Sequence, residues 1–374
     1  MHTLDRTAVV FTSALSLALS LALLLFLAGC GGGSSSTSNS ANASSSGKPQ
    51  FSAVVSFGDS LSDVGAYASA TVDPQTGVAA GGHFTTNPGA IWVEDISATL
   101  GLTISPNVTG FGSAQSSCPL LHCTGYGQGG SRITDPNGVG HSSGELTIPL
   151  VTQMDNFLAA NVGYKPTDIV FVYGGNNDVF VQAATVSAVA AAAAAQPGAT
   201  PESVAAAVGQ ARQAAGVAIT QAATELAGYV RNKIFAKGAV YVALMNLPDS
   251  AATPYGASLS AGGRALLTSL VTIFNDTLQK SVFDQALNVL LIDANDAGKL
   301  VLANPAQYAV TNSTVPACDL TKLPGESALF CNQTTLIASA DGHFLFADGV
   351  HPSAYGHKLF ADYVALQMAK KGWL

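Results

Sequence analysis

Four short apolar runs constrain the fold more than any other feature of this sequence. They are residues 51–57 (FSAVVSF), 168–173 (DIVFVY), 239–244 (AVYVAL) and 288–293 (NVLLID). Each run is continuous in its apolar residues rather than alternating with polar ones. That pattern is typical of strands buried on both faces, as in a parallel sheet covered by helices. The sequence therefore predicts a central parallel sheet.

Stretches with helical character separate and follow these runs. They are residues 90–100, 153–160, 179–195, 200–235, 260–283 and 354–371. Thr200 before Pro201 is a helix start signal, because threonine caps helices and proline fits the first helical position. Strands alternating with helices indicate an α/β domain of three layers, helices on both faces of the sheet. We expect one such domain over residues 51–374.

Residues from about 183 to 235 are rich in alanine, and residues 196–198 (QPG) interrupt this stretch. We expect it to be a helical insertion in the domain. A linker or a repeat is an alternative interpretation. The strong helix propensity of alanine favours two helices inserted after a strand.

The amino-terminal segment predicts export and a lipid anchor. Residues 8–29 are apolar, Arg6 precedes them, and the segment ends in Leu27-Ala28-Gly29-Cys30. A transmembrane anchor or an ordinary secretory signal are alternatives, since about 20 apolar residues span a bilayer. The small residues before Cys30 indicate cleavage and resemble the lipobox of bacterial lipoproteins, in which this cysteine carries the lipid.

We therefore expect a lipoprotein signal peptide over residues 1–29, and over residues 30–50 a lipidated Cys30 followed by a flexible tether. Residues 31–47 are rich in Gly and Ser and cannot pack a core. By analogy with lipoprotein sorting, Gly31 points to the outer membrane and leaves its face undetermined.

Four cysteines remain beyond Cys30, and export places them in an oxidising compartment. Cys118 and Cys123 flank a short loop, while Cys318 and Cys331 flank a longer one. Local pairing is the simplest of the three possible connectivities. A zinc site needs tighter CxxC-like spacing, which these cysteines lack.

Composition and length limit the partners of the protein. The chain has 374 residues, 15 Lys and Arg against 23 Asp and Glu, and a net charge of −8. A nucleic-acid-binding protein needs clustered basic residues, so we expect no nucleic-acid partner. A domain of this length builds its own core without a metal or an oligomer, and we expect a monomer.

A serine follows the first predicted strand directly. Ser60 lies in residues 58–63 (GDSLSD), at a strand-to-helix junction. Such a junction sits at the carboxyl edge of a parallel sheet, where open α/β folds bind ligands. The alternative is a plain helix cap, since Ser and Asp are common in that position.

Other reactive residue types accompany this serine. Asn177 follows the second strand, Gly129 lies in a glycine-rich loop (GYGQGG), and Asp348 and His351 precede the last helix. Together with Ser60 they supply a nucleophile, a backbone donor, an amide donor and a base with its carboxylate. This is the inventory needed for acyl transfer.

Four sequence blocks in this order resemble the GDSL or SGNH family of lipases, esterases and acylhydrolases. They are FGDSLSDVG, the Gly-Gly loop, GGNND and DGVHP, and residues 82–102 resemble the segment before the second block. Thr86-Asn87-Pro88 and Gly127 depart from the commoner family pattern. The resemblance covers essentially everything after the tether.

The resemblance implies a fold, a site and the absence of a metal or cofactor. The fold is the flavodoxin-like α/β/α sandwich of SGNH hydrolases. Ser60 is the nucleophile and His351 the base, oriented by Asp348. The oxyanion hole consists of the backbone N–H groups of Ser60 and Gly129 and the side-chain amide of Asn177. A serine hydroxyl needs such a base, and the base needs a group that fixes its tautomer.

We accordingly expect a serine esterase or lipase that hydrolyses carboxylic esters through an acyl-enzyme on Ser60. The low charge and the Ala-rich insertion suggest an apolar approach, hence fatty acyl or phospholipid esters as small-molecule or lipid substrates. The alternatives are an acyltransferase or a carbohydrate acetyl esterase of the same family, or a catalytically inactive surface-binding lipoprotein.

Three other motifs fit their chemistry less well. Residues 140–144 (GHSSG) match the hydrolase elbow GxSxG but lack the strand and helix that it requires. Residues 125–130 match GxGxxG with the same defect. A metal site would use residues Asp341, His343, Asp348, His351 and His357, but it leaves Ser60 unexplained. Asp63 and Asp178 are expected to cap helices or brace the site.

Overall fold

The structure is a computed structural model that describes residues 48–374, except for residues 73–80, 113 and 119–122. The predicted signal peptide, Cys30 and the tether up to residue 47 lie outside the described residues, so their assignment stays a prediction.

A parallel sheet of four strands forms the centre of the domain. In space the order is β1 (Ala53–Gly58), β4 (Asp168–Tyr173), β5 (Tyr241–Met245) and β6 (Leu290–Ile292). Every strand pair is parallel. All residues of β4 are buried, as expected for a strand covered on both faces. The prediction from the apolar runs is confirmed, with shifts of a few residues at the strand ends.

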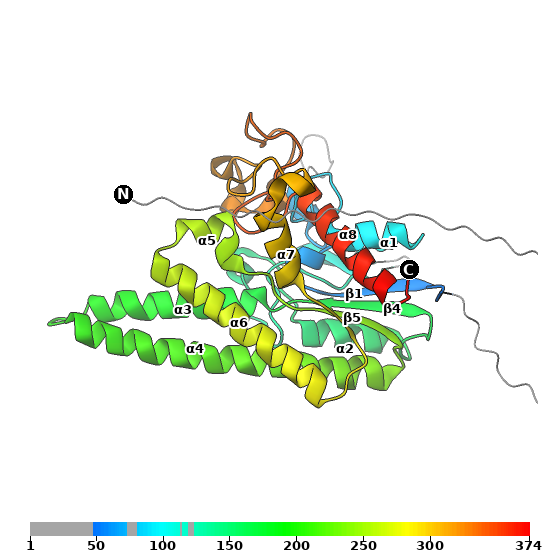
Figure 1. The fold of residues 1–374 in the computed structure, drawn as a ribbon, viewed down its shortest axis with the longest axis horizontal. Helices are drawn as coiled ribbons and strands as arrows, with labels where there is room; N and C mark the ends of the chain where they lie inside the picture. Colours follow the sequence, from blue (N-terminus) through cyan, green and yellow to red (C-terminus); the bar gives the residue numbers. More distant parts are fainter. Residues whose placement is uncertain (1–47, 73–80, 113, 119–122) are drawn as a thin grey trace, which may run out of the picture. The chain divides into compact units, whose positions relative to one another are not determined.

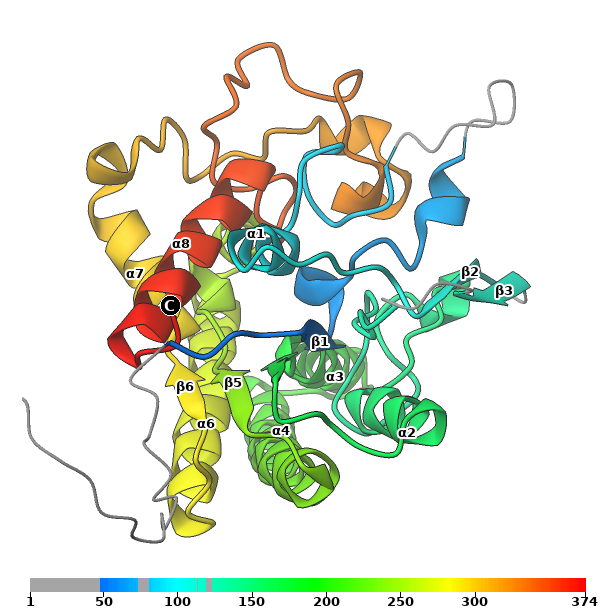
Figure 2. The same cartoon turned by 90° about the vertical axis from the view of Figure 1, so that its right-hand side faces the viewer.

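Helices cover both faces of this sheet (Figures 1 and 2). One face packs on α2 (Leu150–Ala160), α3 (Asn176–Ala194), α4 (Pro201–Tyr229) and α6 (Ala261–Asp284). The other packs on α1 (Trp92–Thr99) and α8 (Ala354–Lys370). Two separate apolar cores result, one on each side, and the predicted three-layer α/β/α fold is correct.

Some elements have weak signals in the sequence. The structure adds α5 (Pro254–Ser258), α7 (Ala294–Ala303) and an antiparallel hairpin of β2 (Val108–Phe111) and β3 (Ala114–Ser117). All four residues of β3 are exposed. Short, polar and exposed strands lack the apolar pattern on which strand prediction depends.

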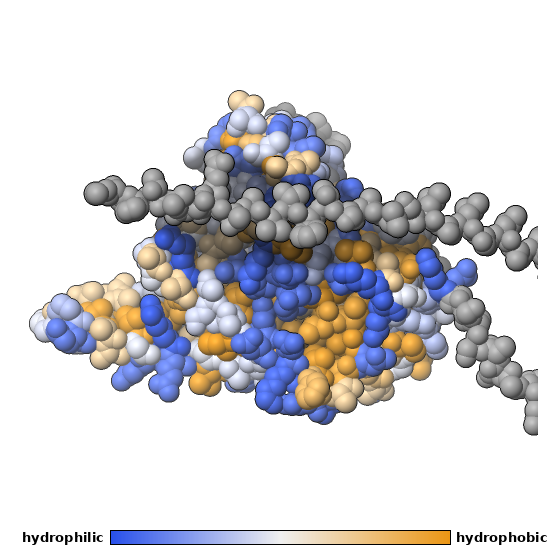
Figure 3. Space-filling model, in the orientation of Figure 1, coloured by the Kyte–Doolittle hydropathy of each residue, from blue (hydrophilic) through white to orange (hydrophobic). Residues whose placement is uncertain are grey.

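The Ala-rich region forms the two predicted helices, α3 and α4, which pack on each other as an antiparallel pair. Thr200 caps α4 by accepting from the N–H of Ser203, and Pro201 is its first residue. A π-helix (Val230–Ile234) and a short 3-10 turn (Phe235–Lys237) end the pair. Figure 1 shows the pair reaching beyond the edge of the sheet, and Figure 3 shows mostly weakly apolar residues at its outer end.

Both predicted disulfides are present, Cys118–Cys123 and Cys318–Cys331. The second lies against the segment that leads into α8. There the N–H of Ala317 donates to the carbonyl of Phe346, and the N–H of Cys318 donates to that of Ala347. This disulfide therefore fixes a loop next to the residues around Asp348 and His351.

Candidate active site

Ser60 lies where the chain leaves β1 and turns into a 3-10 helix, Ser60–Ser62. A Cβ on Gly58 would stand 2.4 Å from the carbonyl oxygen of Tyr173, so only glycine permits this close approach to β4. The carboxylate of Asp59 accepts from the N–H of Leu61 at 3.1 Å and caps the turn. Ser60 is 8% exposed. Its own N–H has no partner among the described residues.

Ser60, His351 and Asp348 form one hydrogen-bonded chain, although 291 positions separate the serine from the histidine. Nε2 of His351 lies 2.9 Å from Oγ of Ser60. Nδ1 of His351 lies 2.7 Å from Oδ2 of Asp348. With Nδ1 protonated toward the carboxylate, Nε2 is the acceptor for the serine proton. The three residues chosen from the sequence are therefore brought together.

The local environment shifts the pKa values of this pair in opposite directions. Burial by itself lowers the pKa of His351, but the adjacent Asp348 carboxylate outweighs burial and the pKa is raised. Burial likewise favours neutral Asp348, but the imidazole and the hydrogen bonds from His351 and Val350 hold the pKa of its carboxyl below the ordinary value. Asp348 is therefore a charged carboxylate, and it lies beside an imidazole, that of His351, whose basicity is increased.

Asp348 receives a further hydrogen bond that the sequence did not predict. The N–H of Ala328 donates to its Oδ2 at 2.6 Å. Oδ1 accepts from the N–H groups of Val350 and His351 at 2.8 and 2.7 Å. Ala328 belongs to the loop closed by Cys318–Cys331. No local pattern marks a backbone donor of this kind, because only the tertiary fold brings it to the carboxylate.

Asn87 is a second residue that supports the site and that the sequence did not predict. It is buried, and its Nδ2 lies within hydrogen-bond distance of the carbonyls of Ala328 and Cys331, at 3.3 and 2.9 Å. Asn87 thus ties its own segment to the disulfide loop. In the same segment, the ring of Phe84 packs against the imidazole of His351 with centroids 5.0 Å apart. Asn87 and Phe84 both lie in residues 82–102, whose resemblance to the family segment before the second block is the sequence feature that could have indicated them.

Asn177 lies in the first turn of α3, directly after β4. Because Gly58 and Tyr173 are paired in register, Ser60 and Asn177 leave neighbouring strands at the same edge of the sheet. The Nδ2 of Asn177 donates one hydrogen to the carbonyl of Ser131 at 2.9 Å. This bond fixes the amide. Within the described part of the chain its second hydrogen has no acceptor, which leaves it available to a ligand.

Gly129 differs from its predicted role. Its N–H donates to Oδ2 of Asp63 at 2.9 Å. The fully buried Asp63 carboxyl also accepts from Gly65 and Ala66, and burial raises its pKa to about 6. The predicted oxyanion donor is therefore engaged by a bracing carboxylate. The N–H of the next residue, Gly130, has no partner in the described part of the chain.

Gln153 connects the nucleophile strand with this loop. Its Oε1 accepts from the N–H of Gly58 at 2.9 Å, and its Nε2 donates to the carbonyl of Gly58 at 2.8 Å. Nε2 also lies 2.8 Å from the carbonyl of Ile148. Asp178 braces the same region by accepting from Nε of Arg132 and the N–H of Ile133. A glutamine on a helix carries no functional signal in sequence, so Gln153 was missed.

The competing motifs have other roles. Residues 140–144 form a 3-10 turn, His141–Ser143, with its serines exposed. Over the described residues, no group of three or more His, Cys, Asp or Glu side chains could hold a metal ion. His357 is instead a core residue, whose Nδ1 accepts from the N–H of Trp92 and whose Nε2 faces the carbonyl of Phe84. Burial lowers its pKa to about 3.

Comparison with known proteins assigns the family. Residues 54–364 match the model of the GDSL-like lipase/acylhydrolase family. An extracellular lipase from Streptomyces rimosus is similar over 84% of this chain and 99% of its own, with 15% identity and a TM-score of 0.39. Phospholipase A1 from Streptomyces albidoflavus is similar over 85% and 99%, with 13% identity and a TM-score of 0.40. No curated protein sequence matches. Since the family match spans most of the chain, and includes Ser60, Asp348 and His351, this protein belongs to the GDSL-like lipases and acylhydrolases.

Proposed function

We propose that the protein hydrolyses carboxylic esters, with a fatty acyl group on the acyl side, through an acyl-enzyme at Ser60. Family membership supports ester hydrolysis. The single observation that carries the mechanism is the continuous chain from Oγ of Ser60 through His351 to Asp348. Apolar residues near the base, such as Phe84 against the imidazole, are consistent with an apolar substrate.

The first half-reaction forms the acyl-enzyme. Oγ of Ser60 attacks the carbonyl carbon while its proton moves to Nε2 of His351. The carbonyl oxygen becomes an oxyanion. His351 then returns the proton to the leaving alcohol as the C–O bond breaks. In the second half-reaction, water gives a proton to Nε2 of His351 as its oxygen attacks the acyl carbon. His351 then returns this proton to Oγ of Ser60 as the bond between Oγ and the acyl carbon breaks and the acid is released.

Three donors are proposed for the oxyanion: the N–H groups of Ser60 and Gly130 and the Nδ2 of Asn177. The two N–H groups have no partner among the described residues, and the amide retains one free hydrogen. Preorganised donors of this kind act most strongly on the charge that develops in the transition state.

Labelling with a fluorophosphonate tests the proposal. The reagent should form one adduct on Ser60, identified by mass spectrometry, and Ser60→Ala should remain folded and unlabelled. Hydrolysis of p-nitrophenyl acetate should be lost in the same variant. A folded wild-type protein that takes no label would favour the catalytically inactive alternative.

We also propose that Cys30 carries a lipid that holds the enzyme at the outer membrane, with residues 31–47 as the tether. The sequence before Cys30 supports this. Metabolic labelling with an alkyne fatty acid in a bacterial host should mark the wild type and leave Cys30→Ser unlabelled. A labelled Cys30→Ser protein would contradict it.

A further inference from the structure

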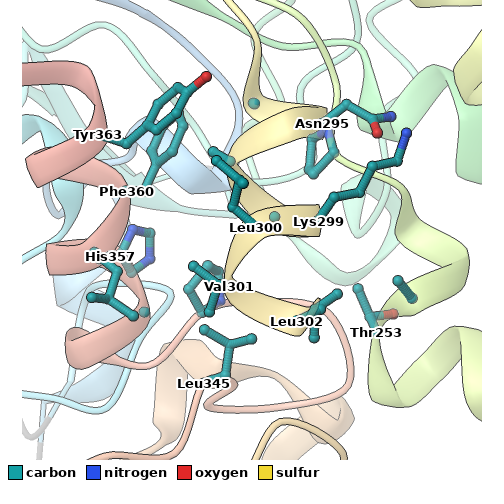
Figure 4. Close-up of a pocket in the computed structure, with 18 of the residues that line it drawn as sticks. Thr253, Asn295, Lys299, Leu300, Val301, Leu302, Leu345, His357, Phe360 and Tyr363 are labelled. Carbon is teal, nitrogen blue, oxygen red and sulfur yellow. The ribbon is translucent and has the colours of Figure 1, made fainter. Parts of the chain in front are cut away.

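A pocket lies between α7 and α8 (Figure 4), and its wall includes sequence neighbours of Ser60 and His351. Its wall includes Tyr173 at the end of β4, residues 248–253 after β5 and much of α7, which follows β6. It thus lies at the carboxyl edge of the sheet, where open α/β folds bind ligands. Leu61 in its wall follows Ser60, and two other wall residues, Val350 and Pro352, flank His351 in sequence.

The pocket is suited to hydrocarbon. Its wall is mostly apolar and includes Trp92, Leu300, Val301, Leu345 and Phe360. Its volume is about 160 Å³, comparable to an apolar protein cavity of roughly 150 Å³ that stays dry and binds benzene. A segment of about six carbons fits a space of that size. Because Leu300 is 39% exposed, the pocket borders the surface and is not an enclosed packing defect.

Polar groups are unevenly placed around this pocket. On the α8 side, His357 is neutral because both ring nitrogens face backbone partners in a buried setting. Figure 4 shows Asn295 and Lys299 together on α7, away from His357. Oδ1 of Asn295 has no hydrogen-bond partner among the described residues. Asp249 is the wall's other charged group, and it accepts from Thr268. An occupant with an apolar chain and a polar end matches this distribution.

We propose that the pocket between α7 and α8 binds the aliphatic chain of a fatty acyl group. The chain has two possible sources, the acyl part of the ester substrate or a free fatty acid. Only the first source rests on the proposed hydrolysis. Either occupant would contact residues on both sides of His351, since Val350 and Pro352 line the pocket.

Gly298 offers a matched pair of variants. It lines the pocket from within α7, and an added Cβ would meet no atom within 4 Å. Gly298→Phe fills space in the pocket, whereas Gly298→Ala adds one methyl group. Both remove a glycine from a helix, which by itself favours folding. The alanine variant therefore controls for backbone effects.

Binding is measured without turnover, in the Ser60→Ala background, by the fluorescence of cis-parinaric acid and its displacement by palmitate. Each buried methylene strengthens binding about four-fold, so excluding two of them costs about fifteen-fold. Gly298→Phe should weaken binding by at least about ten-fold, and Gly298→Ala should bind like its parent. Equal affinity in both variants, or no displacement by palmitate, would overturn the proposal.

Turnover by protein that retains Ser60 identifies the source of the aliphatic chain. If Gly298→Phe lowers kcat/KM for p-nitrophenyl palmitate but not acetate, the pocket takes the substrate's acyl chain. If Gly298→Phe loses binding of the fatty acid while kcat/KM for p-nitrophenyl palmitate relative to that for the acetate is unchanged, the pocket takes a free fatty acid. Absence of hydrolysis in every form would contradict the proposed function and leave the binding result intact.

Discussion

At the residue scale, the proposed mechanism depends on a neutral His351 held by a charged Asp348. The carboxylate raises the pKa of this histidine above its ordinary value of 6.5, against the effect of burial. The base is active only when deprotonated. Activity is therefore present above the raised pKa and lost as the pH falls through it.

The pH profile of kcat/KM tests this arrangement. Its acidic limb should have a midpoint above 6.5, the ordinary pKa of histidine. Asp348→Asn removes the attraction that raises the pKa, so the limb should move to lower pH. Its rate should fall by about 10⁴, as for the same change in serine proteases. If folded Asp348→Asn has its acidic limb at the same pH as the wild type, the role of Asp348 is contradicted.

Asn177 gives a second prediction at this scale. Asn177→Ala removes one side-chain donor and should lower kcat by about 10²–10³, with KM much less affected. The free energy of unfolding, from urea denaturation, should also fall by about 1 kcal/mol, because the bond to Ser131 is lost. Asn176→Ala, at the neighbouring position of the same helix turn, is the control. Near-normal kcat in folded Asn177→Ala would remove this residue from the oxyanion hole.

Gly129 and Gly130 give a structural prediction at the same scale. In a crystal structure of the phosphonylated enzyme, the anionic oxygen should accept from the N–H of Gly130. The N–H of Gly129 should still donate to Asp63, since that buried carboxyl holds three N–H groups. An oxygen bound to Gly129 instead would restore the role that the sequence pattern suggested.

At the scale of elements, the two disulfide loops have different neighbours. The loop closed by Cys318–Cys331 supplies the Ala328 N–H to Asp348 and is held by Asn87. The Cys118–Cys123 loop follows the exposed strand β3. The first loop therefore supports the carboxylate of Asp348. In the second, the N–H of Cys118 donates to the carbonyl of Asn107.

Paired cysteine-to-alanine variants separate these roles. Losing Cys318–Cys331 should cost about 3 kcal/mol of unfolding free energy, and losing Cys118–Cys123 about 2 kcal/mol, from loop-closure entropy. Only the first pair should also lower kcat, because Asp348 loses a donor. Urea denaturation and p-nitrophenyl acetate hydrolysis measure the two effects. Equal kcat in both folded variants would argue against support of Asp348 by the loop.

At the scale of the whole molecule, the α3–α4 pair combines a buried and an exposed part. Ala215, Ile219 and Ala223 of α4 belong to the core, whereas residues 190–206 include no buried residue. The outer part therefore contributes little to stability, and the proposed catalytic residues lie at the sheet edge from which α3 starts.

Replacing residues 190–206 by a short glycine-containing turn tests this division. The free energy of unfolding should change by less than about 1 kcal/mol, since no buried side chain is removed. Hydrolysis of p-nitrophenyl acetate should stay within about two-fold of the wild type. Loss of cooperative unfolding would place the outer part within the folding core.

What the sequence determined by itself is the local part of this protein. A strand covered by helices on both faces needs apolar side chains at successive positions, so continuous apolar runs predict buried parallel strands. β4 lies at the predicted residues. Ser60, Asn177 and His351 stand in short motifs at the ends of elements. Parallel strands bring such positions to one edge, so the serine and asparagine could be placed together from sequence.

Only the tertiary structure decided the contacts between distant segments. The N–H of Gly129 donates to Asp63, that of Gly130 has no partner within the described residues, and the N–H of Ala328 donates to Asp348. The pocket between α7 and α8 is likewise built from separate segments. Backbone donors and cavity walls have no signature in residue type, because any residue carries an N–H and many can line a cavity. Their partners are set by three-dimensional packing.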